Sequence, residues 1–370
     1  MARLKYNNPV GVLPMQDIKR LMDSGYITGI DGKYINPASL DVPLSDEAYR
    51  LESGFLPLKG QKVRSLIKRV GGIRHDLKNP LEVGVPYLIK IAGKIEFPDS
   101  VYAYANPKSS TGRINMLCRT LADGESMYDS LSRRGWSGEL WVSVVVNSFP
   151  VKVTPGQALS QIRLINEKTL LGKFELELEL RKPGLLFHPS GKRFTPHEAH
   201  IHNNALVLSI MVKRGMSGWE CRGSNRLFDL GLVSHYRPSD FFDPVEVTDG
   251  SLRMVKDGFY ILSTRERIAV PPNLSAELRD IDTRFGEFRS HAAGYIDPGW
   301  GWGKDGSEHG RPITLEITPR ENMTVVDGQS IARIRYEQMK AVPEVLYDSA
   351  RSNYTKQKSG AALSKHFKKR

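Results

Sequence analysis

The sequence has little cysteine and no long apolar run. Its 370 residues include two cysteines, Cys118 and Cys221, which cannot form a disulfide framework and suit a reducing compartment. Apolar runs such as residues 205–212 are far too short to span a bilayer. The first residues, MARLKYNNPVG, lack the apolar stretch of a secretory signal. We therefore expect a cytoplasmic protein with no membrane partner.

Acidic residues are fewer than basic ones, 41 against 53, which leaves a net charge of +12. Part of this excess is local, because no acidic residue follows Asp348. Basic residues at this end include Lys356, Lys358, Lys365, Lys368, Lys369 and Arg370. Such a charge run can be a solvated tail, a nucleic-acid arm or a ligand for a nucleoside triphosphate. Composition leaves all three open.

The pattern of residues indicates a mostly β protein. Segments such as residues 95–106 (IEFPDSVYAYAN) and 140–148 (LWVSVVVNS) are short, rich in Val, Ile, Tyr and Phe, and separated by turns. Residues 15–25 (MQDIKRLMDSG) fit a short amphipathic helix ending at a glycine. Residues 175–181 (ELELELR) fit a strand or a helix equally well.

The second half of the chain repeats the first. Residues 95–114 (IEFPDSVYAYANPKSSTGRI) match 268–288 (IAVPPNLSAELRDIDTRFGEF), and 151–164 (VKVTPGQALSQIRL) match 323–336 (MTVVDGQSIARIRY). The offset of roughly 170 residues is the size of one domain. We therefore predict a first domain over residues 1–180, a linker over 181–203, a second domain over 204–340 and a basic C-terminal segment over 341–370.

One loop in the first half is suited to binding an anion. Lys108-Ser109-Ser110-Thr111-Gly112-Arg113 combines small hydroxyl residues with flanking cations. Hydroxyl and backbone N–H groups beside Lys and Arg can hold phosphate oxygens. Serine-rich turns are common loop material, however, so the motif alone does not identify a ligand.

A second notable stretch lies in the last third of the chain. Residues 291–303 (HAAGYIDPGWGWG) form a glycine-rich turn, and residues 312–318 (PITLEIT) alternate between apolar and polar side chains. Ile313, Leu315 and Ile317 would share one face of a strand, and Glu316 would project from the other. A glutamate on the polar face of a strand is most often a solvated surface residue.

Together these stretches resemble the dCTP deaminases of the dUTPase-like superfamily. The resemblance rests on Ala293, on Ile296-Asp297-Pro298-Gly299-Trp300 and on Leu315-Glu316 in the right order. Residues 37–41 (PASLD) are similar to the family's first motif, and Tyr354 and Gln357 to its C-terminal segment. The resemblance implies two tandem dUTPase-like β-barrel (β-clip) domains with short flanking helices.

The resemblance also implies the roles of individual residues. Glu316 would be the catalytic base and acid, assisted by Ser109 and Arg113. The residues implied in substrate binding are Lys108, Ser110, Ala293, Gly294, Tyr295, Asp297, Trp300, Tyr354 and Gln357. Mg²⁺ would accompany the triphosphate, and Asp41 could either support it or make a structural hydrogen bond.

No protein-held metal is expected. The zinc-dependent deaminases need an H-x-E motif and a P-C-x-x-C pair, and two isolated cysteines do not supply them, which excludes that zinc chemistry. His188, His197, His200 and His202 cluster in the expected linker. HEAH at residues 197–200 is not the HExxH zinc motif, so a polar linker is the better interpretation.

The two copies have diverged in complementary ways. The first keeps Ser109, Ser110 and Arg113, but has Ser143 where the glutamate is expected. The second keeps Glu316, but acids replace hydroxyls in its copy of the loop at residues 279–284 (RDIDTR), and these would repel a triphosphate. We therefore predict one composite site between the domains, deaminating dCTP to dUTP and ammonia.

Two alternatives remain open. One is dUTP pyrophosphatase activity, alone or together with deamination, because the superfamily shares this pocket. The other is a non-enzymatic nucleotide- or nucleic-acid-binding protein. Retention of Glu316 with a complementary phosphate loop disfavours the latter, and disfavours a nucleic-acid partner. The sequence also allows a monomer or a homo-oligomer.

Overall fold

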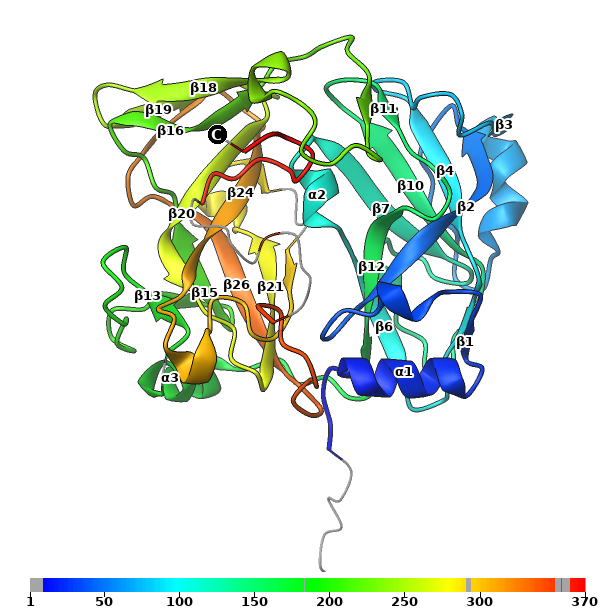
Figure 1. Cartoon of the computed structure of the whole chain (residues 1–370), viewed down its shortest axis with the longest axis horizontal. Coiled ribbons are helices and arrows are strands. Elements are labelled where there is room, and N and C mark those ends of the chain that lie inside the picture. The colour runs from blue at the N-terminus through cyan, green and yellow to red at the C-terminus, as the bar shows by residue number, and fades with distance from the viewer. Residues whose placement is uncertain (1–8, 183, 291–293, 350–353, 355–359, 370) are drawn as a thin grey trace, which may run out of the picture.

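The computed structural model describes residues 9–182, 184–290, 294–349, 354 and 360–369, and of 289 and 290 the backbone alone. Two β-rich halves lie side by side, and the C-terminal segment runs between them (Figure 1). Both the mostly β fold and the tandem arrangement confirm the sequence prediction. No helix within the described residues is long and apolar enough to cross a membrane.

The first half is a nearly closed antiparallel barrel. One sheet has the order β7-β10-β4-β2-β12-β6-β8, with β3 paired to β2. Its two ends meet at Asp129, whose N–H donates to Thr120 O on one end strand and whose carbonyl accepts from Ala105 N near the other, both at 2.9 Å. A small second sheet has the order β1-β5-β9.

The elements of this half are α1 (Met15–Asp23), β1 (Ile27–Thr28), η1 (Gly32–Tyr34), β2 (Leu40–Arg50), η2 (Val63–Val70), β3 (Ile73–His75), β4 (Pro86–Ile91), β5 (Lys94–Glu96), β6 (Tyr102–Pro107), α2 (Ser109–Gly112), β7 (Met116–Ala122), β8 (Ser130–Leu131), β9 (Ser137–Gly138), β10 (Leu140–Val146), β11 (Val151–Lys152) and β12 (Ala158–Ile165).

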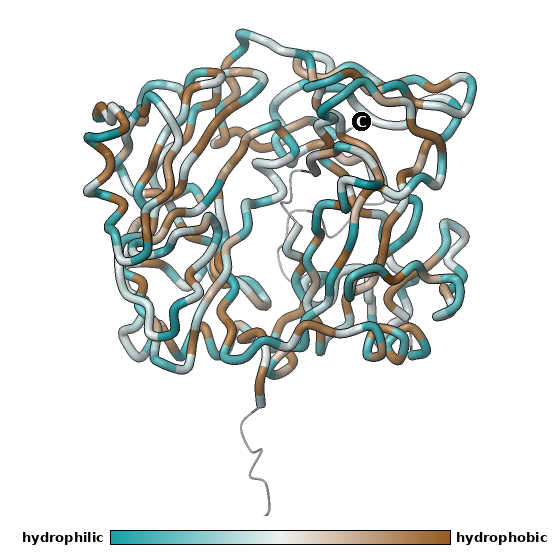
Figure 2. Tube along the Cα trace, turned by 180° about the vertical axis from the view of Figure 1, so that it is seen from behind, coloured by the Kyte–Doolittle hydropathy of each residue, from teal (hydrophilic) through white to brown (hydrophobic). Residues whose placement is uncertain are grey.

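The second half contains two larger sheets. One has the order β18-β16-β20-β24-β22 with β13 paired to β20, the other the order β14-β15-β26-β21-β23, and β19 pairs with β25. Apolar stretches follow the strands of both halves, and hydrophilic stretches follow many of the connections (Figure 2). The first apolar core fills the barrel and extends to rings of the second half such as Phe228 and Phe241, and a second core lies within the second half.

The elements of this half are α3 (Lys173–Arg181), β13 (Leu186–Phe187), β14 (Ile201–His202), β15 (Ala205–Ser209), β16 (Gly215–Cys221), β17 (Phe228–Asp229), η3 (Pro238–Asp240), β18 (Phe242–Val247), β19 (Ser251–Met254), β20 (Tyr260–Ile268), β21 (Leu274–Asp280), η4 (Thr283–Phe285), β22 (Phe288–Ser290), β23 (Tyr295–Ile296), η5 (Lys304–Gly306), β24 (Arg311–Pro319), β25 (Met323–Val326) and β26 (Ser330–Gln338).

Strand register identifies equivalent positions in the two halves. Tyr87 in β4 and Tyr260 in β20 each accept, through the hydroxyl, a hydrogen bond from the backbone N–H five residues earlier. Tyr87 pairs with Val144, and Tyr260 pairs with Ile317. The residues one position earlier, Ser143 and Glu316, therefore occupy equivalent places in β10 and β24.

A buried group of charged and polar side chains joins the two halves. Arg163 Nη2 of the first half lies 3.0 Å from Glu277 Oε2 of the second, and its Nη1 lies 3.2 Å from Glu337 Oε2. Asn106 Nδ2 donates to Glu277 Oε1 at 2.9 Å. Arg163 and Glu277 are 3% and 5% exposed, so each charge depends on its partners.

We expect Glu277→Gln to destabilise the protein by about 3–5 kcal/mol, because it leaves the buried Arg163 guanidinium undercompensated. The unfolding midpoint in urea measures the loss. Glu287→Gln, which neutralises an exposed glutamate, is the matched control and should shift the midpoint little. Equal midpoints for the two variants would contradict the role given to this ion pair.

Candidate functional site

A cavity of about 270 Å³ lies between the two halves. It is lined from the first half by Lys33, Asn36, Asp41, Lys108, Ser109, Ser110, Arg113 and Gln161, and from the second half by Leu278, Gly294, Tyr295, Ile296, Asp297, Trp300, Ile313, Thr314, Glu316, Tyr347 and Tyr354. The serine loop and the Glu316 strand therefore meet at one cavity although they lie far apart in sequence.

The serine-loop side of the cavity is formed by α2. The hydroxyl and N–H of Thr111 both donate to Lys108 O, at 2.6 and 2.9 Å, which closes the turn. Lys108 Nζ forms an ion pair with Asp41. Burial, and then the charge of nearby Lys108, lower the pKa of Lys365. This side of the cavity thus collects cations, as a phosphate group requires.

The hairpin side is held against the first half by Tyr295 and Asp297. Asp297 Oδ1 accepts from Ala38 N at 2.9 Å, and Tyr295 Oη donates to Ala38 O at 3.2 Å. Burial raises the pKa of Asp297 to about 7. Gly294 is needed for close packing, because a Cβ at this position would lie 2.3 Å from the Cβ of Leu278. These contacts fix the hairpin relative to the cavity.

Glu316 lies in β24 with its carboxyl group buried in the cavity. Its neighbours Leu315 and Ile317 are fully buried in the second core, so the predicted alternation is confirmed. Glu316 is 5% exposed, its Oε1 lies 3.9 Å from Arg113 Nε, and its Oε2 has no hydrogen-bond partner among the described residues. Burial raises the pKa of Glu316 to about 8, and Arg113 opposes this shift.

The C-terminal segment contacts three parts of the site. Thr314 Oγ1, two residues before Glu316, donates to Gly360 O at 2.5 Å. Arg113 Nη1 donates to Ala362 O at 3.1 Å, and Ser364 Oγ donates to Ser110 O at 3.0 Å. The Tyr354 ring lies 4.0 Å from the Arg113 guanidinium. This segment therefore holds the glutamate strand, the arginine and the serine loop together.

The end of the same segment is anchored between aromatic rings. Phe367 is 4% exposed and packs against rings of the second half that belong to the first apolar core. These rings are Phe228, Tyr236, Phe241 and Phe242. Their loop docks on the first half through the parallel pair β11–β17. The basic tail was predicted as either a lid or a solvated end. Residues 360–367 are packed against the protein, whereas Lys368 and Lys369 are exposed.

The structure brings most of the predicted site residues to one cavity. Lys108, Ser109, Ser110, Arg113, Gly294, Tyr295, Asp297, Trp300, Glu316 and Tyr354 all line it. Ala293 and Gln357 lie outside the described residues. Asn36, Gln161 and Thr314 also line the cavity, but single polar residues in strands and turns gave no sequence signal. The contacts made by residues 360–364 were missed for the same reason.

Asp41 places a carboxylate of the cavity beside Lys108 of the serine loop. Asp41 pairs with Lys108 and accepts from Asn36 Nδ2 at 2.8 Å. Mg²⁺ is commonly held by one or two carboxylates together with substrate phosphates, so this donor set fits a triphosphate-bound ion. Across the described part of the chain, His, Cys, Asp and Glu form no group of three that could hold a metal alone.

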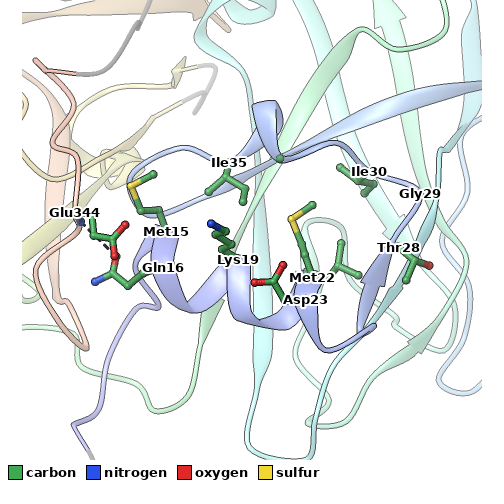
Figure 3. A pocket seen from close by; sticks show the side chains of 12 residues that line it. Met15, Gln16, Lys19, Met22, Asp23, Thr28, Gly29, Ile30, Ile35 and Glu344 are labelled. Atoms are coloured by element: carbon green, nitrogen blue, oxygen red, sulfur yellow. Dashed lines mark hydrogen bonds between the residues drawn. The ribbon is translucent and has the colours of Figure 1, made fainter.

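A larger cavity of about 560 Å³ lies beside α1. Met15, Met22, Ile30 and Ile35 line it together with Lys19 and Asp23 (Figure 3), and it contains none of the predicted site residues. Ile35 lines the larger cavity and the adjacent Asn36 lines the smaller one. The serine loop and Glu316 identify the smaller cavity as the candidate site.

The raised pKa of Glu316 predicts a pH-dependent stability. Between its ordinary value of 4.5 and about 8, the folded state holds a proton that the unfolded state releases. The free energy of unfolding should therefore fall as pH rises, by up to about 1.4 kcal/mol per pH unit. Glu316→Gln lacks this contribution, so its free energy should fall less steeply in urea titrations from pH 5 to 8. Parallel curves would contradict a buried, neutral Glu316.

The anchor predicts that Phe367→Ala releases the C-terminal segment, because truncating a buried phenylalanine costs about 3–5 kcal/mol. Trypsin should then cleave after Lys365 several times faster than in the wild-type protein, as followed by mass spectrometry. Val342→Ala removes an exposed side chain and serves as the control. Unchanged cleavage in Phe367→Ala would show that the segment is held elsewhere.

Family models and a solved structure match most of this chain. Residues 9–168 match the N-terminal domain model of 2'-deoxycytidine 5'-triphosphate deaminase, and residues 188–367 match the C-terminal domain model. Among solved structures, the 2'-deoxycytidine 5'-triphosphate deaminase from Agrobacterium tumefaciens is similar, with 29% identity and a TM-score of 0.83, over 92% of this chain and 98% of that one. A search of curated proteins gives no match.

The domain boundaries chosen from the sequence remain predictions. The two family models together cover most of the chain, which therefore belongs to the 2'-deoxycytidine 5'-triphosphate deaminase family.

Proposed function

We propose that this protein hydrolyses the amino group of dCTP, giving dUTP and ammonia, in the cavity between its halves. The observation that carries the proposal is the carboxyl group of Glu316. It is buried, has a pKa of about 8, and lies 3.9 Å from the Arg113 side chain of the other half. A carboxyl group with a pKa near the working pH can exchange a proton in both directions.

The first step is addition of water to C4 of the cytosine. The Glu316 carboxylate takes a proton from the water as the water oxygen bonds to C4, and passes that proton to the ring nitrogen N3. The Arg113 guanidinium favours the ionised form of Glu316, because an opposite charge lowers a carboxyl pKa. Leu315 and Ile317 keep the strand beneath the carboxylate buried and fixed.

The second step is loss of ammonia. Glu316 takes the proton of the new C4 hydroxyl and gives it to the amino group, so that the C4–N bond breaks, ammonia leaves and a carbonyl forms at C4. General acid–base help of this kind is typically worth about 10²–10⁴ in rate. Ser109 and Arg113, beside Glu316, would polarise the base. Backbone groups at Gly294 and Tyr295, with Ala293, would read the pyrimidine edge.

The phosphates would lie at the cationic side of the cavity, on Lys108 and Ser110. Mg²⁺ held there by Asp41 would neutralise triphosphate charge when bound. Asp297 supports the hairpin through Ala38, and the sugar would lie against this turn. Trp300 Nε1 has no hydrogen-bond partner among the described residues and is a further donor for the nucleotide. Tyr354 and Gln357 would close over the bound substrate.

Each half supplies only part of this site. The first half provides Ser109 and Arg113 but has Ser143 at the position equivalent to Glu316, and serine cannot act as a base here without a partner that activates it. The second half provides Glu316 but carries Asp280 and Asp282 in its copy of the serine loop. One catalytic site per chain is the arrangement that fits this division.

Pyrophosphatase activity on dUTP is the second candidate, because the same cavity would hold its substrate. Binding of nucleic acid is less well supported. The basic residues at the described C-terminal end belong to a segment whose Phe367 and Ser364 are buried in the protein, which leaves less of the tail free for a polynucleotide.

Product analysis with dCTP and Mg²⁺ tests the proposal. The wild-type protein should form dUTP and ammonia, and Glu316→Gln should lose about 10²-fold or more in kcat because its amide accepts no proton. Glu246→Gln, at an exposed glutamate, is the charge-matched control. Formation of dUMP and pyrophosphate from dUTP alone would establish the pyrophosphatase instead. Turnover of neither nucleotide would leave a binding protein.

Co-expression of two inactive chains tests the composite site. If one chain supplies both parts, Ser109→Ala and Glu316→Gln chains should stay inactive together. Recovery of roughly a quarter or more of wild-type activity would mean that the site forms between chains.

A further inference from the structure

Arginine side chains cluster on the two central strands of a second-half sheet, on the side that faces the first half. Arg279 on β21 lies directly opposite Arg333 on β26, and Glu277 lies opposite Arg335. Residues two apart on a strand share a face, so these four side chains project to the same side. Leu278 and Ile334, which alternate with them, are buried in the second core.

The carboxylates of this cluster are already engaged. Glu277 Oε1 accepts from Asn106, while its Oε2 lies 3.0 Å from Arg163 Nη2 and 2.8 Å from Arg279 Nη2. Glu337 lies against the other arm of Arg163. Among the described side chains of this cluster, two glutamates therefore face Arg163, Arg279, Arg333 and Arg335, and two positive charges are left over.

Arg335 carries much of this excess charge. Its Nε is buried and has no hydrogen-bond partner among the residues that the structure describes. The neighbouring Arg333 donates to the backbone carbonyl of Asp280, at 2.9 and 3.1 Å. Burial, and then the charges of Arg279 and Arg333, lower the pKa of Arg335. Like charges held this close favour a counter-anion.

The cluster is accessible from solvent. The side chain of Arg279 is 45% exposed, and Arg333 and Arg335 are partly exposed, whereas Arg163 is almost fully buried. An approaching anion would thus meet Arg279, Arg333 and Arg335 first. None of these three lines the cavity that contains Glu316.

We propose that Arg279, Arg333 and Arg335 form a second anion site, which binds phosphate groups of the pyrophosphate or polyphosphate class. Planar guanidinium groups donate paired N–H bonds that match phosphoryl oxygens. Three such groups with two uncompensated charges suit a polyanion better than a monovalent ion. The site stands independently of the deaminase proposal, since it uses none of that site's residues.

The anion site is connected to the catalytic cavity through packed residues. Arg279 pairs with Glu277, which pairs with Arg163, whose guanidinium lies 5.3 Å from the Tyr295 ring of the base hairpin. On the other side, Glu277 accepts from Asn106, two residues before Lys108. Phosphate binding at Arg279 would alter its contact with Glu277, so occupancy of this site can modulate the cavity.

Isothermal titration of the full-length protein with inorganic pyrophosphate tests the proposal. The wild-type protein should bind at two sites, the serine loop and the arginine cluster. Arg335→Gln should weaken the second by about 10-fold or more, since it removes charge-assisted hydrogen bonds. Arg335→Lys keeps the charge but loses the paired donors, so it should give an intermediate affinity. Lys108→Gln should weaken the serine-loop site and leave the other intact.

Arg320→Gln, at an exposed arginine paired with Asp257, is the control for loss of one positive charge. Arg335→Gln should also unfold at the same temperature as wild type, or higher, without pyrophosphate, because it relieves repulsion. If pyrophosphate then raises the unfolding temperature of Arg335→Gln less than that of the wild-type protein, the variant has lost binding. Equal affinities for pyrophosphate in Arg335→Gln, Arg320→Gln and the wild-type protein would overturn the proposal.

Titration of Lys108→Gln with dCTP in place of pyrophosphate distinguishes the source of the phosphate. If Lys108→Gln binds dCTP at least about 10-fold more tightly than pyrophosphate, and if adding Arg335→Gln weakens this binding, the natural ligand is a nucleotide. Equal affinities would indicate the phosphate chain alone. Failure of dCTP turnover would leave the pyrophosphate titration unchanged, so the two proposals fail separately.

Discussion

The approach of Glu316 to Arg113 is the constraint on which the rest of the structure depends. A carboxyl group in a buried strand position is costly to ionise, and the positive charge that opposes this cost, on Arg113, comes from the other half of the chain. If the halves were displaced by a few ångströms, Glu316 would lose this compensation. The scaffold must therefore fix one half against the other more tightly than two linked domains usually require.

Several kinds of contact meet this requirement. Tyr295 and Asp297 attach the hairpin to Ala38 of the first half. Arg163 and Glu277 join the barrel to the second sheet through a buried ion pair. A loop of the second half pairs with β11, and Phe367 packs against it. The C-terminal segment thus stabilises the packing of the two halves against each other, and it also contacts the candidate site.

The sequence predicted the fold and much of the candidate site because those signals are local. Alternation in residues 312–318 gave the buried and polar faces of β24, and the internal repeat gave two equivalent halves. Where the local pattern was ambiguous, tertiary contacts decided. Residues 175–181 form part of helix α3, with Leu176 and Leu180, one helical turn apart, buried in the second core.

What the sequence determined by itself was the chemistry: a serine loop kept in one copy, a glutamate kept in the other, and the family resemblance that these residues carry. Only the tertiary structure decided that they line one cavity, that burial raises the pKa of Glu316, and that the basic C-terminus is anchored at Phe367. Burial and charge compensation depend on residues more than 100 positions apart, such as Arg113 and Glu316, and no local pattern encodes such contacts.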